Sequence, residues 1–187
     1  MRLFATISTG KFKGKKIELP SLKITRSTKS IVKGSFFDTV RDELYGKVFI
    51  EGFGGSALMA CEAFSNGAKS AIAIEIDKDA FKLTSKNMAS IDKNLKAIHG
   101  DSFALLPAII ASASESVVLY LDPPFDIRDG FSDIYKKTIK MVESLDESKI
   151  FMIVFEHSSQ IKFDEKISNF TMFKSKKFGA TTLSYYS

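Results

Sequence analysis

Apolar and polar positions follow two alternating periods along most of the chain, and this pattern predicts a doubly wound α/β sheet. From Lys47 onward, short apolar runs of strand length are separated by longer segments with apolar residues at helical spacing. Strands that alternate with helices favour a parallel sheet that is buried on both faces. The expected strands are 48–50, 71–76, 97–98, 117–121, 150–155, 170–174 and 181–186, with helices at 56–66, 79–90, 103–111 and 131–144.

The two ends of this pattern differ from a simple doubly wound fold. The last two strands lie too close in sequence for a crossover helix, so we expect an antiparallel end to the sheet. A mixed, mostly parallel seven-stranded sheet with helices on both faces resembles the Rossmann-like class I methyltransferase fold. Residues 1–20 indicate a β-hairpin, and apolar spacing predicts a connecting helix over 30–41. We expect a hairpin extension over 1–29 and one main domain over 30–187.

Charge is unevenly distributed, and its distribution points to a polyanionic partner. Residues 1–33 contain nine Lys/Arg and one acidic residue, whereas the whole chain has a net charge of +5. A basic segment in front of a mildly acidic body suits a nucleic-acid backbone, because each neutralised phosphate releases counterions. A solubilising surface segment is the alternative. The best candidates for phosphate contacts are Lys11, Lys13, Lys15, Lys16 and Arg26.

Composition excludes several classes of protein. The single cysteine, Cys61, cannot form an intramolecular disulfide or a cysteine metal cluster, and neither histidine has companions at metal-ligand spacing. We therefore assign no metal. The apolar runs are far shorter than the roughly 20 residues of a membrane-spanning helix, and the N-terminus does not resemble a secretory leader. A cytoplasmic protein without membrane contact is expected.

The first chemical signal is the glycine-rich segment from Glu51 to Ala57, between a predicted strand and a predicted helix. Ligands of open α/β sheets bind outside the carboxyl ends of the strands, where glycines allow close approach to the backbone. A nucleoside cofactor fits this position. The segment lacks the G-x-G-x-x-G spacing of a pyrophosphate site, and a tight turn without a ligand is the alternative.

Two further acidic positions follow the next two strands. Glu75, followed by Ile76, ends the second strand, where a carboxylate can accept hydrogen bonds from both ribose hydroxyls. Asp101 and Ser102 follow the third strand and could contact an adenine amino group. The alternatives are an exposed acid at a strand end for Glu75 and a helix N-cap for Asp101 and Ser102.

The most specific signal is Asp122-Pro123-Pro124-Phe125, directly after the apolar strand 117–121. Two prolines fix the backbone and remove two N–H donors, so that carbonyl oxygens and a carboxylate remain as acceptors. If the Asp122 carboxylate and the Pro123 carbonyl hold both hydrogens of an aromatic amine, its nitrogen can face an electrophilic methyl group while Phe125 stacks on the base. A capped Pro-Pro loop is the alternative. The residues assigned to catalysis are Asp122, Pro123, Pro124 and Phe125.

Several segments, spread over nearly the whole chain, share their order with one known family. They are Gly10–Ile17, Arg26–Thr28, Val32–Asp38, Phe53–Leu58, Glu62–Ala68, Glu75–Asp77 and Asp122–Phe125. In these segments the chain resembles the RsmD family, bacterial methyltransferases of guanine N2 in 16S ribosomal RNA. The resemblance implies S-adenosylmethionine as cofactor, ribosomal RNA or a small-subunit assembly particle as partner, and a monomer.

The resemblance also implies roles for individual residues. The methionine end of the cofactor would be bound by Glu51, Phe53, Gly54, Gly55 and Ser56. Glu75 would bind the ribose, and Asp101 with Ser102 the adenine. Ile76 would be a further cofactor-binding residue. RNA would be bound by Lys11, Lys13, Lys15, Lys16, Arg26 and Thr28.

Four positions depart from the family pattern. Family members usually have Asp at position 51, Gly at 57, Pro at 27 and an acid at 34, where this chain has Glu51, Ala57, Ser27 and Gly34. The first two bear on cofactor affinity, the others on the substrate entrance. Two alternatives stay open: an amino methyltransferase acting on adenine N6 or cytosine N4 of DNA, and a non-catalytic RNA-binding protein on the same scaffold.

Overall fold

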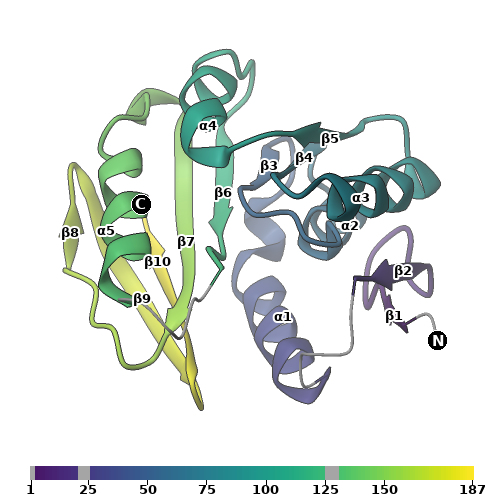
Figure 1. The fold of residues 1–187 in the computed structure, drawn as a ribbon, viewed down its shortest axis with the longest axis horizontal. Helices are drawn as coiled ribbons and strands as arrows, with labels where there is room; N and C mark the ends of the chain where they lie inside the picture. The colour runs from purple at the N-terminus through teal and green to yellow at the C-terminus, as the bar shows by residue number, and fades with distance from the viewer. Residues whose placement is uncertain (1–2, 21–25, 125–130) are drawn as a thin grey trace.

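The computed structural model describes residues 3–20, 26–124 and 131–187, with side chains given from residue 30 in the second range and from 133 in the third. One sheet of eight strands forms the body, and a separate two-stranded sheet lies beside it (Figure 1). The order in the large sheet is β5-β4-β3-β6-β7-β10-β9-β8. The strands are β3 (Val48–Glu51), β4 (Ser70–Glu75), β5 (Leu95–His99), β6 (Val117–Leu121), β7 (Ile150–Ser158), β8 (Lys166–Ile167), β9 (Phe170–Phe178) and β10 (Thr181–Tyr186).

The first five strands of this sheet run parallel, and β10, β9 and β8 pair antiparallel at one end. The predicted mixed, mostly parallel α/β fold with an antiparallel end is therefore confirmed. The sheet has eight strands where the sequence predicted seven, because β8 has only two residues and leaves no periodic signal. Strand β7 also continues past the apolar run, which ends at Phe155, through Glu156, His157 and Ser158.

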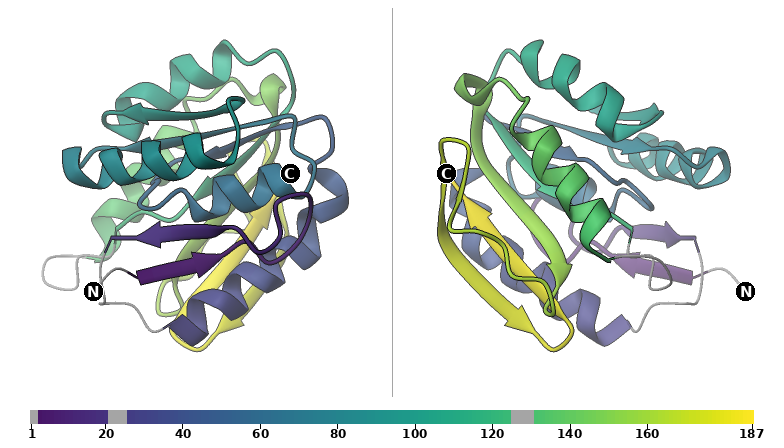
Figure 2. Two further views of the ribbon diagram at one scale, coloured as in Figure 1. Left: turned by 90° about the vertical axis from the view of Figure 1, so that its right-hand side faces the viewer. Right: turned by 60° about the vertical axis from the view of Figure 1, so that its left-hand side comes forward.

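Helices cover both faces of the sheet (Figure 2). The core on one face includes residues from α1 (Arg26–Val40), α2 (Leu58–Ser65) and α3 (Lys78–Ile91). The core on the other face includes residues from α4 (Ser102–Ala111) and α5 (Phe131–Val142). Alternation along each strand separates the two cores, so that Tyr120 packs toward α1 while its neighbours Leu119 and Leu121 pack toward α4 and α5.

Helix boundaries lie within a few residues of those expected. The connecting helix α1 begins at Arg26 rather than at position 30, and a short 3-10 turn, Arg41–Glu43, follows it. A second 3-10 turn, Glu147–Lys149, precedes β7. No helix within the described residues has the length and apolar content that crossing a membrane requires.

The N-terminal hairpin consists of β1 (Leu3–Thr6) and β2 (Lys16–Leu19), as predicted. Its turn lies against the end of α2, where Gly10 has φ +79° and an added Cβ would come within 1.8 Å of the Ser65 carbonyl oxygen. Only glycine fits this contact. On the other side, the Asn87 amide of α3 bonds the backbone of Glu18 in both directions, at 3.1 and 2.9 Å.

Candidate cofactor and substrate cavity

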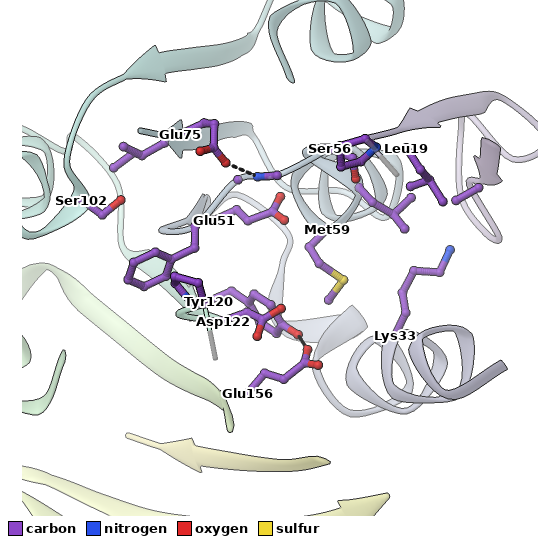
Figure 3. Close-up of a pocket in the computed structure, with 18 of the residues that line it drawn as sticks. Leu19, Lys33, Glu51, Ser56, Met59, Glu75, Ser102, Tyr120, Asp122 and Glu156 are labelled. Carbon is purple, nitrogen blue, oxygen red and sulfur yellow. Dashed lines mark hydrogen bonds between the residues drawn. The ribbon is translucent and has the colours of Figure 1, made fainter. Parts of the chain in front are cut away.

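One cavity of about 1030 Å³ lies at the carboxyl ends of the parallel strands, between the sheet, the hairpin and α1 (Figure 3). The glycine-rich segment and the Asp122 turn both open into it, because β3 and β6 are adjacent strands with Glu51 opposite Tyr120. The predicted residues among its lining are Glu51, Phe53, Gly54, Gly55, Ser56, Glu75, Ile76, Asp101, Ser102, Asp122 and Pro124. Signals that are far apart in sequence thus meet in one place.

The glycine-rich segment passes close to β4. The Gly54 amide donates to the Ile74 carbonyl oxygen at 2.7 Å, and a Cβ at Gly54 would lie 3.0 Å from that oxygen. The next amide, that of Gly55, donates to Oε2 of Glu75 at 2.7 Å. This bond fixes the loop and the carboxylate relative to each other, so the cavity edge between β3 and β4 is rigid.

Glu75 is also bonded from its other side, because the Asp77 amide donates to Oε1 at 2.8 Å. A carboxylate offers about four acceptor positions, so two backbone bonds leave acceptor capacity for ribose hydroxyls. Ile76 beside it is 65% exposed and lines the cavity. An exposed apolar side chain next to an acceptor suits a nucleoside, whose sugar is polar and whose base has apolar faces.

Asp101 and Ser102 make hydrogen bonds at the start of α4 and also line the cavity. The Asp101 carboxylate accepts from the Phe103 amide at 2.9 Å and caps α4, while the Ser102 hydroxyl donates to the Gly52 carbonyl oxygen. Both residues also line the cavity. The capping interpretation is therefore correct for Asp101, whereas the bond to Gly52 holds Ser102 at the cavity wall.

At the acceptor turn, Asp122 and Pro124 line the cavity, whereas Pro123, the remaining described residue of this turn, is buried and absent from the lining. Phe125 lies outside the described residues. Figure 3 shows Asp122 close to the side chains of Tyr120 and Glu156, with Glu75 and Ser102 at the opposite end of the cavity. Glu75 and the Asp122 turn thus lie in different parts of one cavity.

Sequence reasoning missed several lining residues. Tyr120 lies inside the uniformly apolar run of β6, and its phenol donates to Oε2 of Glu156, 7% exposed, at the end of β7. An acid at the carboxyl end of the strand next to β6 was the available signal for Glu156. Phe103 packs edge-to-face on Phe53 with centroids 5.7 Å apart. Other unpredicted lining residues are Pro20, Ser30, Val32, Lys33, Leu58, Met59, Ile74, Ile134, Lys137 and, from the hairpin, Leu3, Phe4, Ala5, Thr6, Ser8 and Leu19.

The lysines predicted to bind RNA lie on the hairpin turn and β2, exposed to solvent. Of the cavity-lining residues that the structure describes, none is Lys11, Lys13, Lys15 or Lys16. They form a basic edge outside the cavity rather than part of its wall. Arg26 and Thr28 belong to the first turn of α1, but their side chains lie outside the described part of the chain.

The electrostatic environment of the cavity is acidic. The described lining residues include five carboxylates and two lysines, Lys33 and Lys137. Burial raises the pKa of the Tyr120 phenol well above its ordinary value, and the charges of Glu156 and Asp122 raise it further. Tyr120 therefore remains a hydrogen-bond donor at neutral pH. An acidic cavity favours a cationic ligand.

Two departures from the family pattern are placed by the structure. Ala57 has φ +57°, a left-handed conformation that glycine adopts more easily, and its fully buried methyl group belongs to the core rather than to the cavity lining. This methyl group therefore does not narrow the cavity. Gly34 lies in α1 with open space around it, so the structure gives no reason for glycine there. The side chain of Ser27 lies outside the described residues.

Burial shifts the pKa of titratable groups elsewhere in the chain. Burial raises the pKa of the Cys61 thiol, and Glu51 and Glu62 raise it further. Desolvation lowers the pKa of His157, whose ring bonds Ser184 Oγ at 2.8 Å. Within the described residues no group of three or more His, Cys, Asp or Glu side chains could hold a metal ion.

The strand order and a ligand cavity at the carboxyl ends of β3, β4 and β6 define a Rossmann-like class I methyltransferase fold. Within this class, residues 5–187 match the family described as "Conserved hypothetical protein 95", the RsmD family, and the chain belongs to it. The predicted family resemblance is confirmed.

Individual relatives agree with this assignment. The chain is 23% identical over 186 residues to a Bacillus subtilis protein provisionally named rRNA methyltransferase YlbH, covering 96% of this chain and 97% of that protein. It is 23% identical over 183 residues to ribosomal RNA small subunit methyltransferase D of Haemophilus influenzae, covering 96% and 92%. The solved structure of Escherichia coli YhhF, provisionally described as a methyltransferase, superposes with TM-score 0.75 at 20% identity, over 98% and 97% of the two chains.

Proposed function

We propose that this protein transfers a methyl group from S-adenosylmethionine to the exocyclic N2 amine of a guanine in small-subunit ribosomal RNA. The observation that carries the proposal is the shared cavity, in which the glycine-rich edge with Glu75 faces the turn with Asp122. The names of the relatives, which specify ribosomal RNA, support the substrate. The methyl transfer would take place in the cytoplasm, where small subunits assemble.

The residues of the cavity fit the cofactor. Glu75 would accept the ribose hydroxyls, Ile76 would pack on the adenine, and the backbone of Gly54 and Gly55 with Glu51 would hold the methionine end. The acidic lining suits the positive sulfonium, which supplies an electrophilic methyl group when the cofactor is bound.

On the opposite side, the Asp122 carboxylate would accept a hydrogen bond from the target amine and orient its nitrogen. The Pro123 carbonyl oxygen would accept the second hydrogen of the same amine. The basic hairpin edge would bind phosphates next to the flipped base, and it adds affinity without sequence specificity. The substrate base itself would enter between the hairpin strand β1 and the Asp122 turn.

The proposal is tested with tritiated cofactor and small-subunit particles or DNA, followed by identification of the methylated nucleoside. N2-methylguanosine in ribosomal RNA is the expected product, and label in DNA alone would refute the assignment. No binding of S-adenosylmethionine in calorimetry would instead indicate the non-catalytic scaffold.

Two variants separate the roles of the two cavity ends. Asp122→Ala should lower kcat by at least about 100-fold through lost orientation, with the affinity for S-adenosylmethionine nearly unchanged. Glu75→Ala should weaken cofactor binding about 10- to 100-fold, as expected for losing hydrogen bonds to a charged group. Equal loss of binding in both variants would contradict the assigned roles.

A further inference from the structure

The cavity contains a second carboxylate next to Asp122 that the proposed mechanism leaves without a role. Leu121 of β6 and Phe155 of β7 are register partners in parallel strands, and Asp122 and Glu156 are the next residues of the two strands. Adjacent strands lie about 4.8 Å apart, and successive residues of a strand point to opposite faces of the sheet. Residues that are opposite each other in register therefore point to the same face. Both carboxylates line the cavity, and Figure 3 shows them side by side.

Glu156 is held in place by its neighbours. Glu156 is 7% exposed, and its Oε2 accepts a hydrogen bond from the buried Tyr120 phenol. A carboxylate offers about four acceptor positions, so the bond from the phenol does not exclude a bond from a ligand. The raised pKa of Tyr120 keeps this donor protonated, which fixes the orientation of the Glu156 carboxylate. A fixed acceptor in a largely buried position is suited to discriminate between ligands.

The bases that have an exocyclic amine differ at the neighbouring ring nitrogen. Guanine has a hydrogen on N1 beside its N2 amine, whereas adenine N1 and cytosine N3 each present a lone pair beside the amine. An ionised carboxylate can only accept. A carboxylate beside the amine acceptor therefore bonds guanine and opposes the lone pairs of adenine and cytosine.

We propose that Glu156, oriented by Tyr120, binds the N1–H of the guanine whose amine Asp122 holds, and that it makes the site selective for guanine. This inference rests on the proposed function and adds to it the residue that selects the base. The acceptor turn alone does not select a base, because amino methyltransferases of different bases share it. Glu156 would supply the selection for guanine.

The test uses the full chain and 2-aminopurine, which keeps the amine but has a lone pair at N1. After the wild-type guanine is mapped, the same RNA is made with 2-aminopurine at that position, and kcat/KM is measured for both. We expect the wild type to prefer guanine by about 10- to 100-fold, the range of one good base contact. Glu156→Gln provides an amide that can donate to the lone pair, so the preference should fall at least tenfold.

The control is Glu51→Gln, which removes the same charge from another carboxylate of the cavity lining, on β3. It should change the KM for cofactor and leave the base preference unaltered. Because 2-aminopurine also lacks O6, the wild-type ratio of kcat/KM for guanine to that for 2-aminopurine is not decisive alone. The decisive quantity is how much this ratio changes from the wild type to each variant. Melting curves followed by circular dichroism check that both variants fold.

Three results would overturn the inference. The first is equal use of guanine and 2-aminopurine by the wild type, which needs no variant. The second is an unchanged preference in Glu156→Gln, or an equal change in Glu51→Gln. In both cases N2-methylguanosine still forms and the proposed function stands. The third is a wild type that methylates no guanine in ribosomal RNA, which refutes the proposed function together with the inference.

Discussion

Lys33 and Glu62 form a buried ion pair that joins the hairpin, α1 and α2, and replacing Lys33 with methionine tests how the hairpin is held. The Lys33 ammonium lies 2.6 Å from Glu62 Oε2, with side-chain exposures of 8% and 0%. It also donates to the Thr6 carbonyl oxygen at 3.0 Å and to Ser8 Oγ at 2.6 Å. The pair therefore connects helix α1 to both the hairpin and α2.

The expected cost follows from what remains around Glu62 after the substitution. Its carboxylate would still accept from the Ser8 and Thr9 amides, at 2.8 to 3.0 Å, but these donors are neutral. A fully buried charge without its partner destabilises by about 3 to 5 kcal/mol. Lys33→Met combined with Glu62→Gln removes both charges and keeps an acceptor for the amides, so it should be more stable than Lys33→Met alone by about 1 to 3 kcal/mol.

Urea unfolding followed by circular dichroism measures these differences. Hydrogen exchange of the Ser8 and Lys11 amides, which bond Glu62 and Ser65 of α2, reports on hairpin docking. Lys69→Met serves as a control, because it breaks the largely exposed pair with Glu115 and should cost less than about 1 kcal/mol. The reasoning fails if Lys33→Met costs no more than Lys69→Met. It fails equally if the double variant is as unstable as Lys33→Met.

Two further predictions concern buried residues near the cavity. Ala57→Gly loses a buried methyl group but relieves a left-handed alanine, so it should be at least about 1 kcal/mol less destabilising than Ala63→Gly, an equally buried position inside α2, in urea unfolding. The raised pKa of Cys61 keeps its thiol protonated through pH 9, so iodoacetamide should leave the folded protein unmodified there and react only after urea unfolding. Rapid alkylation of the folded protein at pH 8 would contradict the burial.

The mixed, mostly parallel sheet and the segments that line the cavity at its strand ends could be predicted from sequence because their signals are local. Strand β6 has the bounds expected from its apolar run, and each predicted ligand-binding segment directly follows a strand. Carboxyl ends of parallel strands meet at one edge of a sheet, so a correct strand order brings these segments together.

The missed features depend on contacts between distant parts of the chain. Glu156 follows an apolar run that ends at Phe155, where the sequence also predicted the end of the strand. Its place beside Asp122 depends on the register of β6 against β7. The hairpin lines the cavity because Glu62, in the middle of another helix, accepts bonds from its backbone. Neither relation has a local pattern. The basic turn suggested an RNA contact, whereas the docking of that turn on α2 gave no sequence signal.

The departures at positions 51 and 57 bear on whether the scaffold still suits catalysis, and the structure shows what each of the two side chains contacts. Ala57 precedes the first residue of α2 and has no side-chain oxygen with which to cap the helix. Glu51 Oε2 instead accepts from the Ala60 amide at 2.9 Å, which satisfies one of the unpaired N–H groups of the first turn and places a negative charge at the helix N-terminus. Glu51 thus provides an acceptor for the first turn of α2, which neither alanine nor the usual glycine at position 57 could supply. Because the methyl of Ala57 points into the core and Glu51 still lines the cavity, these two changes leave the glycine-rich edge intact, and this favours the enzyme over the non-catalytic scaffold.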